Sequence, residues 1–87
     1  MAQKKAPFKA GDHIAYMPDG HSLVPALVVS VEQSGSGAWR GDILTEAHGL
    51  LANRMLHSDF VIKKSGLQEA NRIAWASAWE RLEKANG

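Results

Sequence analysis

The feature of the sequence that most constrains the fold is the apolar run at residues 24–31, which reads Val-Pro-Ala-Leu-Val-Val-Ser-Val. A run of this length that is rich in valine favours a strand buried on at least one face. Pro25 cannot donate a backbone hydrogen bond, so we expect it at the start of the strand or on an unpaired side. Residues 17–21 form a turn sequence before the run, and the polar residues 33–38 form a loop after it. The run is therefore predicted to be a strand set between a rigid turn and a flexible loop.

The remaining chain is predicted to be short strands followed by one helix. Extended patterns occur at residues 12–17, 39–46 and 60–63, and residues 50–56 fit either a strand or a helical turn. After residue 64, apolar residues recur at steps of three and four, the spacing of one helical face. Ser65 and Gln68 have the spacing of a capping box, in which each side chain bonds a free backbone N–H of the first helical turn. We expect five strands and then a helix over about residues 66–85.

Size and composition limit the class of protein. A chain of 87 residues forms one domain with a small core. The absence of cysteine excludes disulfides, thiolate zinc sites and thiol catalysis, and it suits a reducing compartment. The N-terminus lacks the apolar segment of a signal peptide, and no apolar stretch approaches the ~18 residues of a membrane span. These features predict a cytoplasmic protein that does not enter a membrane.

The positive charge is concentrated at the N-terminus. The net charge is +1, but residues 1–11 contain three lysines and no acid. We expect residues 1–10 to be a basic flexible arm and residues 11–87 to be the folded domain. The arm is either a solvated leader or a contact for phosphates or an acidic partner.

The order of turns and strands carries a family resemblance. Five short strands that open with Gly11-Asp12 and include a wide polar loop resemble an SH3-like small β-barrel. Within that class, Tyr16-Met17-Pro18-Asp19-Gly20 followed by residues 24–28 is similar to small barrel proteins of phages and mobile elements. The resemblance covers residues 11–63. It implies an SH3-like five-stranded antiparallel barrel over these residues and an accessory role in a phage or mobile element. With the helix that the apolar spacing predicts, the expected fold is mainly β, an SH3-like five-stranded antiparallel barrel followed by a C-terminal helix.

No residue pattern indicates catalysis or a cofactor. The four histidines are scattered, and none are spaced at i and i+4 on a helix. His57, Ser58 and Asp59 have the residue types of a catalytic triad, but sequence neighbours do not point at one another in the required geometry. The glycines near residue 37 are not followed by the Gly-Lys-Ser/Thr of a phosphate-binding loop. We expect a protein without enzyme activity, metal or cofactor.

Protein–protein interaction is the leading functional hypothesis. Trp39 follows the Gly/Ser loop and stands beside Arg40, so an aromatic ring and a guanidinium are placed near one end of the expected barrel. With the 18–21 turn they form the candidate partner-binding set: Trp39, Arg40, Asp19 and His21. In the alternative interpretation, Trp39 begins a strand and packs under the C-terminal helix.

Two further hypotheses stay open at this point. Trp75 and Trp79 have helical spacing and form either a helix–barrel contact or the interface of a homodimer. Nucleic acid is an alternative partner, bound through Lys4, Lys5, Lys9, Lys63 and Lys64. The third hypothesis is a small-ligand site or enzyme that is formed only at an oligomer interface.

Overall fold

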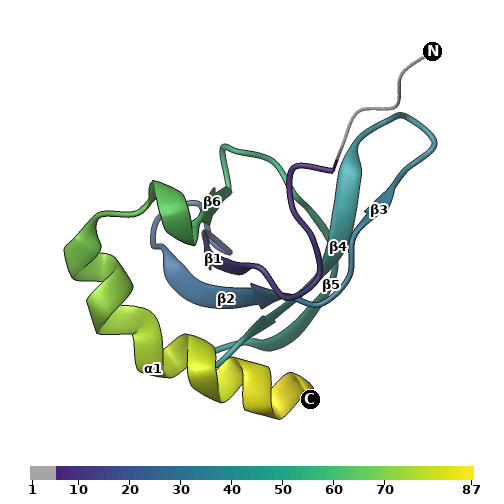
Figure 1. Ribbon diagram of the computed structural model, residues 1–87. Coiled ribbons are helices and arrows are strands. Elements are labelled where there is room, and N and C mark those ends of the chain that lie inside the picture. Colours follow the sequence, from purple (N-terminus) through teal and green to yellow (C-terminus); the bar gives the residue numbers. More distant parts are fainter. Residues whose placement is uncertain (1–5) are drawn as a thin grey trace.

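One antiparallel sheet and one C-terminal helix make up the fold (Figure 1). The computed structural model describes residues 6–87. The strands are β1 (His13–Tyr16), β2 (Val24–Val28), β3 (Glu32–Gln33), β4 (Trp39–Thr45), β5 (Gly49–Met55) and β6 (Val61–Lys63). They are followed by the 3-10 turn η1 (Lys64–Gly66) and the helix α1 (Glu69–Asn86). The predicted mainly β chain with one helix is confirmed, and residues 50–55 are strand rather than helix.

The sheet is open. Its strand order is β3-β4-β2-β1-β6. β5 pairs with the other side of β4, so that Ile43 lies between Val28 of β2 and Leu51 of β5. Within residues 6–87, no backbone pairing joins β5 to β1 or β6. The sheet has six strands instead of the expected five, because residues 32–33 pair with the start of β4 across the polar loop. β5 and β6 are therefore two free ends of a curved sheet.

The apolar run at residues 24–31 is a strand only as far as Val28. Beyond it the chain passes close over β4, where Val29 donates to the backbone oxygen of Asp42 at 2.9 Å. A β-carbon at position 41 would overlap the carbonyl oxygen of Ser30, so only Gly41 allows this approach. Pro25 is second in β2 and faces Ala15 of β1, while pairing with β4 starts one residue later. The expectation for Pro25 is therefore confirmed.

Alternating residues of the sheet supply two separate cores. On one face, Ile14, Tyr16 and Val28 pack with Phe8, which comes from the segment before β1. On the other face, Ala15 and Leu27 pack against the helix. Because Phe8 is 6% exposed and belongs to the first core, the folded part begins before residue 11, and the expected arm at residues 1–10 is too long.

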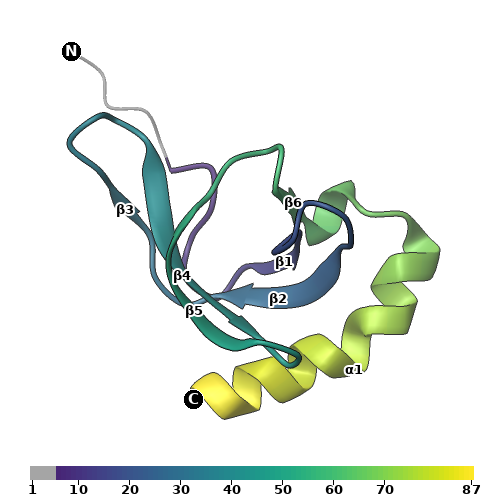
Figure 2. The same ribbon diagram turned by 180° about the vertical axis from the view of Figure 1, so that it is seen from behind.

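Trp79 joins the helix to the sheet. Its side chain is fully buried, and its indole Nε1 donates to the carbonyl oxygen of Ile14 at 3.0 Å. The ring of His13 stacks on it at 5.4 Å between centroids, and Trp75 meets it edge-on at 6.0 Å. Figure 2 shows α1 along one side of the curved sheet, and Leu82 is the other large residue of α1 that is buried there. Trp79 is therefore the central residue of the buried face of α1, which confirms the helix–sheet contact as its role.

The helix begins later than the sequence pattern indicates. Ser65 lies in η1, Leu67 is extended and buried in the second core, and Gln68 is the N-cap without a side-chain cap bond. The predicted capping box is therefore wrong, because burial of Leu67 requires an extended link between η1 and α1. Near the other end, Arg81 donates from Nε and one Nη to the carboxylate of Glu46, at 2.6 and 3.0 Å. This pair ties α1 to the turn between β4 and β5.

Replacing Trp79 by Phe tests the helix–sheet contact. The smaller ring keeps apolar contacts but removes the N–H that Ile14 accepts, so we expect a loss of about 1–3 kcal/mol in the free energy of unfolding. Trp75→Phe is the matched control, because Trp75 is only half-buried and makes no side-chain hydrogen bond within residues 6–87. Chemical denaturation of both variants measures the difference. Equal losses in the two variants would contradict a special role for the Trp79 bond.

Candidate functional site

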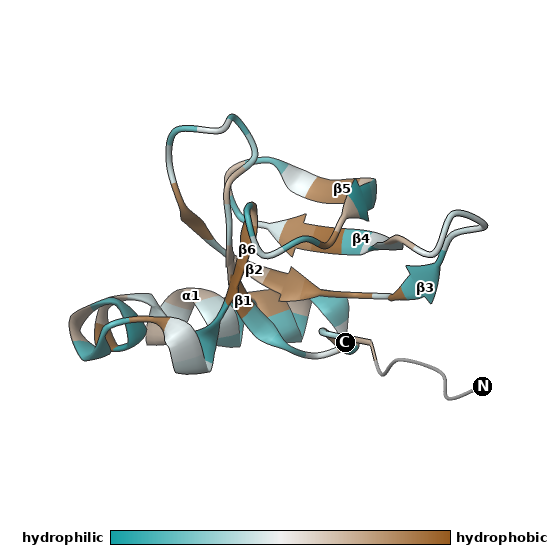
Figure 3. Cartoon of the chain, turned by 90° about the horizontal axis from the view of Figure 1, so that it is seen from above, coloured by the Kyte–Doolittle hydropathy of each residue, from teal (hydrophilic) through white to brown (hydrophobic). Residues whose placement is uncertain are grey.

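A groove lies between β5 and the turn that follows β1. Its volume is about 510 Å³, and we call it the β5 groove. One wall comes from the turn and from the residue before β6, and the other comes from β5 and its neighbour β4. The principal lining residues are Met17, Pro18, Arg40, Arg54, Met55 and Phe60. Figure 3 shows β5 at the margin of the sheet away from α1, so the groove is remote from the helix.

Two exposed apolar side chains face this groove from opposite walls. Met55 is 43% exposed and Phe60 is 41% exposed. The position of Phe60 is set by the backbone, because its N–H bonds the carbonyl oxygen of His57 and its own oxygen accepts from Met17 at 3.0 Å. Nothing in the sequence pattern singles out Met55 or Phe60 as surface residues. Large apolar residues in strand-like segments are normally assigned to a core.

Arg40 is held in a defined position at the edge of the groove. Its Nε donates to the side-chain oxygen of Asn53 at 3.0 Å, and one Nη donates to the backbone oxygen of Asn53 at 2.7 Å. Asn53 has a positive φ of 54° at an irregularity in the β4–β5 pairing, and its N–H bonds the Asp42 carboxylate at 2.9 Å. This bulge turns the Asn53 oxygen toward Arg40. The guanidinium is therefore oriented before any ligand arrives.

The β5 groove is positively charged. Arg40 and Arg54 both line it, and no carboxylate does so within the described part of the chain. Neither arginine forms an ion pair with another residue in the range 6–87. Apolar walls between two arginines whose charge no carboxylate of the described residues balances suit a ligand that has both apolar and acidic groups.

Asp19 and His21 contribute to the turn and not to the groove lining. The Oδ1 atom of Asp19 accepts from the backbone N–H of His21 at 2.8 Å and of Ser22 at 3.0 Å. The bonds from Ser22 and then from His21 hold the pKa of the Asp19 carboxyl below its ordinary value of 3.8. Both Asp19 and His21 are exposed. The structure thus brings Arg40 and the turn together, with Asp19 as the residue that shapes the turn.

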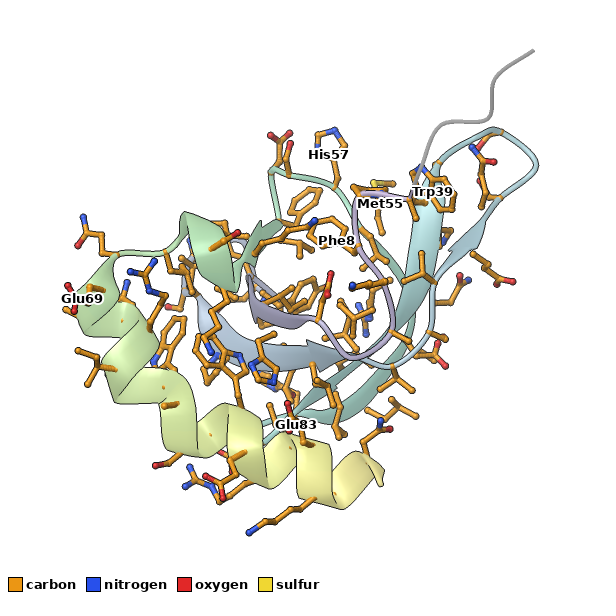
Figure 4. The ribbon with its side chains drawn as sticks, in the orientation of Figure 1. Phe8, Trp39, Met55, His57, Glu69 and Glu83 are labelled. Atoms are coloured by element: carbon orange, nitrogen blue, oxygen red, sulfur yellow. The ribbon has the colours of Figure 1, made fainter. Side chains whose placement is uncertain are left out.

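Trp39 lines a neighbouring depression of about 330 Å³, which we call the Trp39 pocket. Figure 4 shows Trp39, Met55, His57 and Phe8 gathered at one end of the sheet. Trp39 is half-buried and packs against the core that contains Phe8, while α1 covers the other core. Packing of Trp39 under the helix is therefore wrong. Because Met55 lines both depressions, the Trp39 pocket and the β5 groove meet at this residue.

Three of the predicted nucleic-acid-binding lysines gather at a third depression. Lys9, Lys63 and Lys64 line a volume of about 500 Å³ together with the acidic residues Asp12 and Glu83. The ammonium of Lys63 lies 5.7 Å from the centre of the Phe8 ring, and that of Lys64 lies 5.3 Å from the Trp79 ring. We call this surface the lysine depression. Lys4 and Lys5 lie outside the described residues.

Of the two tryptophans predicted to form a homodimer interface, only Trp75 is exposed enough to contact a second copy. Trp79 has no exposed surface left for a second copy to cover, whereas Trp75 is half-buried. Ile73, nearby on α1, is 69% exposed. The dimer stays a prediction, carried by Trp75 and Ile73.

The histidines do not gather into a metal site. Within residues 6–87, no three His, Asp or Glu side chains are placed to hold a metal ion. His13 pairs with Glu83, and His57 lies 3.4 Å from the Asp59 carboxylate. Over the same residues, the chain forms no helix with the length and apolar character needed to traverse a bilayer.

No protein family, curated protein or solved structure that was compared with this chain matches it.

The pH dependence of stability tests the role of Asp19 in the turn. Its pKa is lower in the folded chain than its ordinary value of 3.8, so its stabilising effect is complete above that pH and is lost as pH falls through the folded-state pKa. Asp19→Asn keeps an oxygen acceptor but does not titrate. We expect the wild type to have the higher Tm at pH 7 and the gap to close below about pH 4. A gap that stays constant from pH 7 to pH 2.5 would show that Asp19 does not stabilise the turn through its charge.

Proposed function

We propose that this protein is a small non-catalytic module that binds a protein partner through the β5 groove. The SH3-like class and an accessory role in a phage or mobile element are parts of the same proposal. They are supported by the resemblance of residues 11–63 and by a strongly curved antiparallel sheet. The observation that carries the binding function is the pairing of exposed Met55 and Phe60 across a groove that Arg40 flanks.

The composition of the groove suits protein recognition. Methionine, aromatic residues and arginine are enriched at the centres of protein interfaces, and methionine adapts its shape to different partners. Covering the exposed parts of Met55 and Phe60 contributes on the order of 1 kcal/mol each. Arg40 loses little side-chain freedom on binding, since Asn53 already holds it. Met55, Phe60 and Arg40 therefore all contribute to binding at the same surface, the β5 groove.

Selection from a displayed library of random 12-residue peptides tests this function. We expect the wild-type protein to enrich peptides whose affinity falls at least tenfold in Phe60→Ser and Met55→Ser, because each change removes an apolar wall of the groove. Ile73→Ser is the matched control, since Ile73 is the most exposed large apolar residue described and lies on α1. Fluorescence anisotropy measures the affinities, and thermal unfolding checks that all variants fold. Recovery of no peptide, or equal binding to groove and control variants, would refute the proposal.

Nucleic-acid binding is the second candidate function. It is favoured by the meeting of Lys9, Lys63 and Lys64 at the lysine depression. Asp12 and Glu83 oppose it, because they bring two carboxylates to the same surface. Binding there would depend on phosphate contacts and would show little sequence preference.

Salt dependence separates this candidate from peptide binding. If three lysines contact phosphates, the logarithm of the affinity for single-stranded DNA should fall with the logarithm of salt concentration with a slope of about −2. The double substitution Lys63→Glu and Lys64→Glu should abolish the binding, while Arg54→Glu in the β5 groove should leave it unchanged. If a labelled single-stranded DNA of 20 nucleotides shows no binding to the protein at low salt, this candidate function is refuted.

A further inference from the structure

The outer edge of β5 is open where it borders the β5 groove. β5 has seven residues and pairs only with β4 within the described chain. Proteins usually protect an edge strand of this length, because its unpaired N–H and C=O groups attract further strands. Here the residues Ala52–Met55 form one wall of a groove of about 510 Å³. The edge is thus both unpaired and accessible.

The direction of the backbone groups identifies which residue faces outward. Leu56 donates its N–H to the carbonyl oxygen of Trp39 in β4 at 2.9 Å. Backbone groups of successive residues in a strand point to opposite sides, so the N–H and C=O of Met55 point away from β4. The side chain of Met55 lines the groove as well. Met55 therefore offers both an apolar contact and a pair of backbone hydrogen-bonding groups.

We propose that the partner binds as an extended acidic segment that adds a strand to β5, with its backbone on Met55 and a carboxylate on Arg40 or Arg54. This inference rests on the proposed function and specifies its ligand. The groove is lined by two arginines and no acid in the described part of the chain, so charge complementarity selects an acidic segment over a basic one. Backbone pairing selects an extended segment over a helix or a proline-rich one, because proline lacks the N–H.

The bulge at Asn53 supports this mode of binding. The backbone N–H and C=O of Asn53 are already occupied by Asp42 and Arg40. An incoming strand therefore has its first free partner at Met55, beside the guanidinium that Asn53 holds. The bulge places a fixed cation next to an open backbone position, which defines the register of the added strand.

N-methylation of the strongest peptide from the random library separates strand addition from side-chain docking. We expect methylation of every second backbone nitrogen to weaken binding about tenfold and methylation of the others to have little effect, because only alternate N–H groups face β5. Changing the acidic residue of the peptide to its amide should weaken binding to the wild-type protein. The same change should not weaken binding to the variant that lacks the arginine contacted by this residue, which is either Arg40→Gln or Arg54→Gln.

Amide hydrogen exchange gives a second measurement with an internal control. Saturation with the same peptide should slow exchange of the Met55 amide at least tenfold, while the Leu56 amide, already bonded to Trp39, should change little. Tolerance of N-methylation at all positions, unchanged exchange at Met55, or enrichment of basic or proline-rich peptides would overturn strand addition. If these results occur while Phe60→Ser still abolishes binding, the proposed function stands and only the binding mode fails.

Discussion

The hydrogen bond from Trp79 to the carbonyl oxygen of Ile14 is the contact on which the arrangement of helix and sheet depends. A small domain buries only part of its apolar surface, so each large buried side chain contributes strongly to stability. Trp79 is the largest fully buried side chain and the only tryptophan of the described chain that is completely enclosed. Its donor must find an acceptor inside the protein, and Ile14 of β1 supplies it. This requirement fixes the rotation of α1 about its own axis, with Trp79 turned toward the sheet.

The position of the helix explains where the free surface is. With α1 covering one face and Phe8 closing the other, the two cores leave neither face of the central strands β1 and β2 open. The sheet does not close on itself within the described residues, because no backbone pairing joins β5 to β6. The β5 groove lies at this opening. Binding is thus proposed at the place where the fold leaves backbone groups unpaired, and not on a sheet face or on the helix.

Some features follow from local chemistry and were predictable from the residues alone. Residues 18–20 form a turn because proline, aspartate and glycine each favour one of its conformations, and Pro25 lies where β2 has a single neighbour. The change from a period of two to a period of 3.6 after residue 64 predicted the single C-terminal helix. The start of that helix was misjudged, because burial of Leu67 prevails over the capping spacing of Ser65.

The sequence by itself determined the mainly β composition, the turn and the helix, since each depends on residues close together in the chain. Only the tertiary structure decided that Met55, Phe60 and Arg40 line one groove. These residues come from β5, from the segment before β6 and from β4, and they share a groove because the sheet curves. Curvature depends on long-range contacts such as the approach of Ser30 to Gly41, which no local pattern encodes. For the same reason Trp39 lies against Phe8, thirty-one residues away in the chain, and not under the helix.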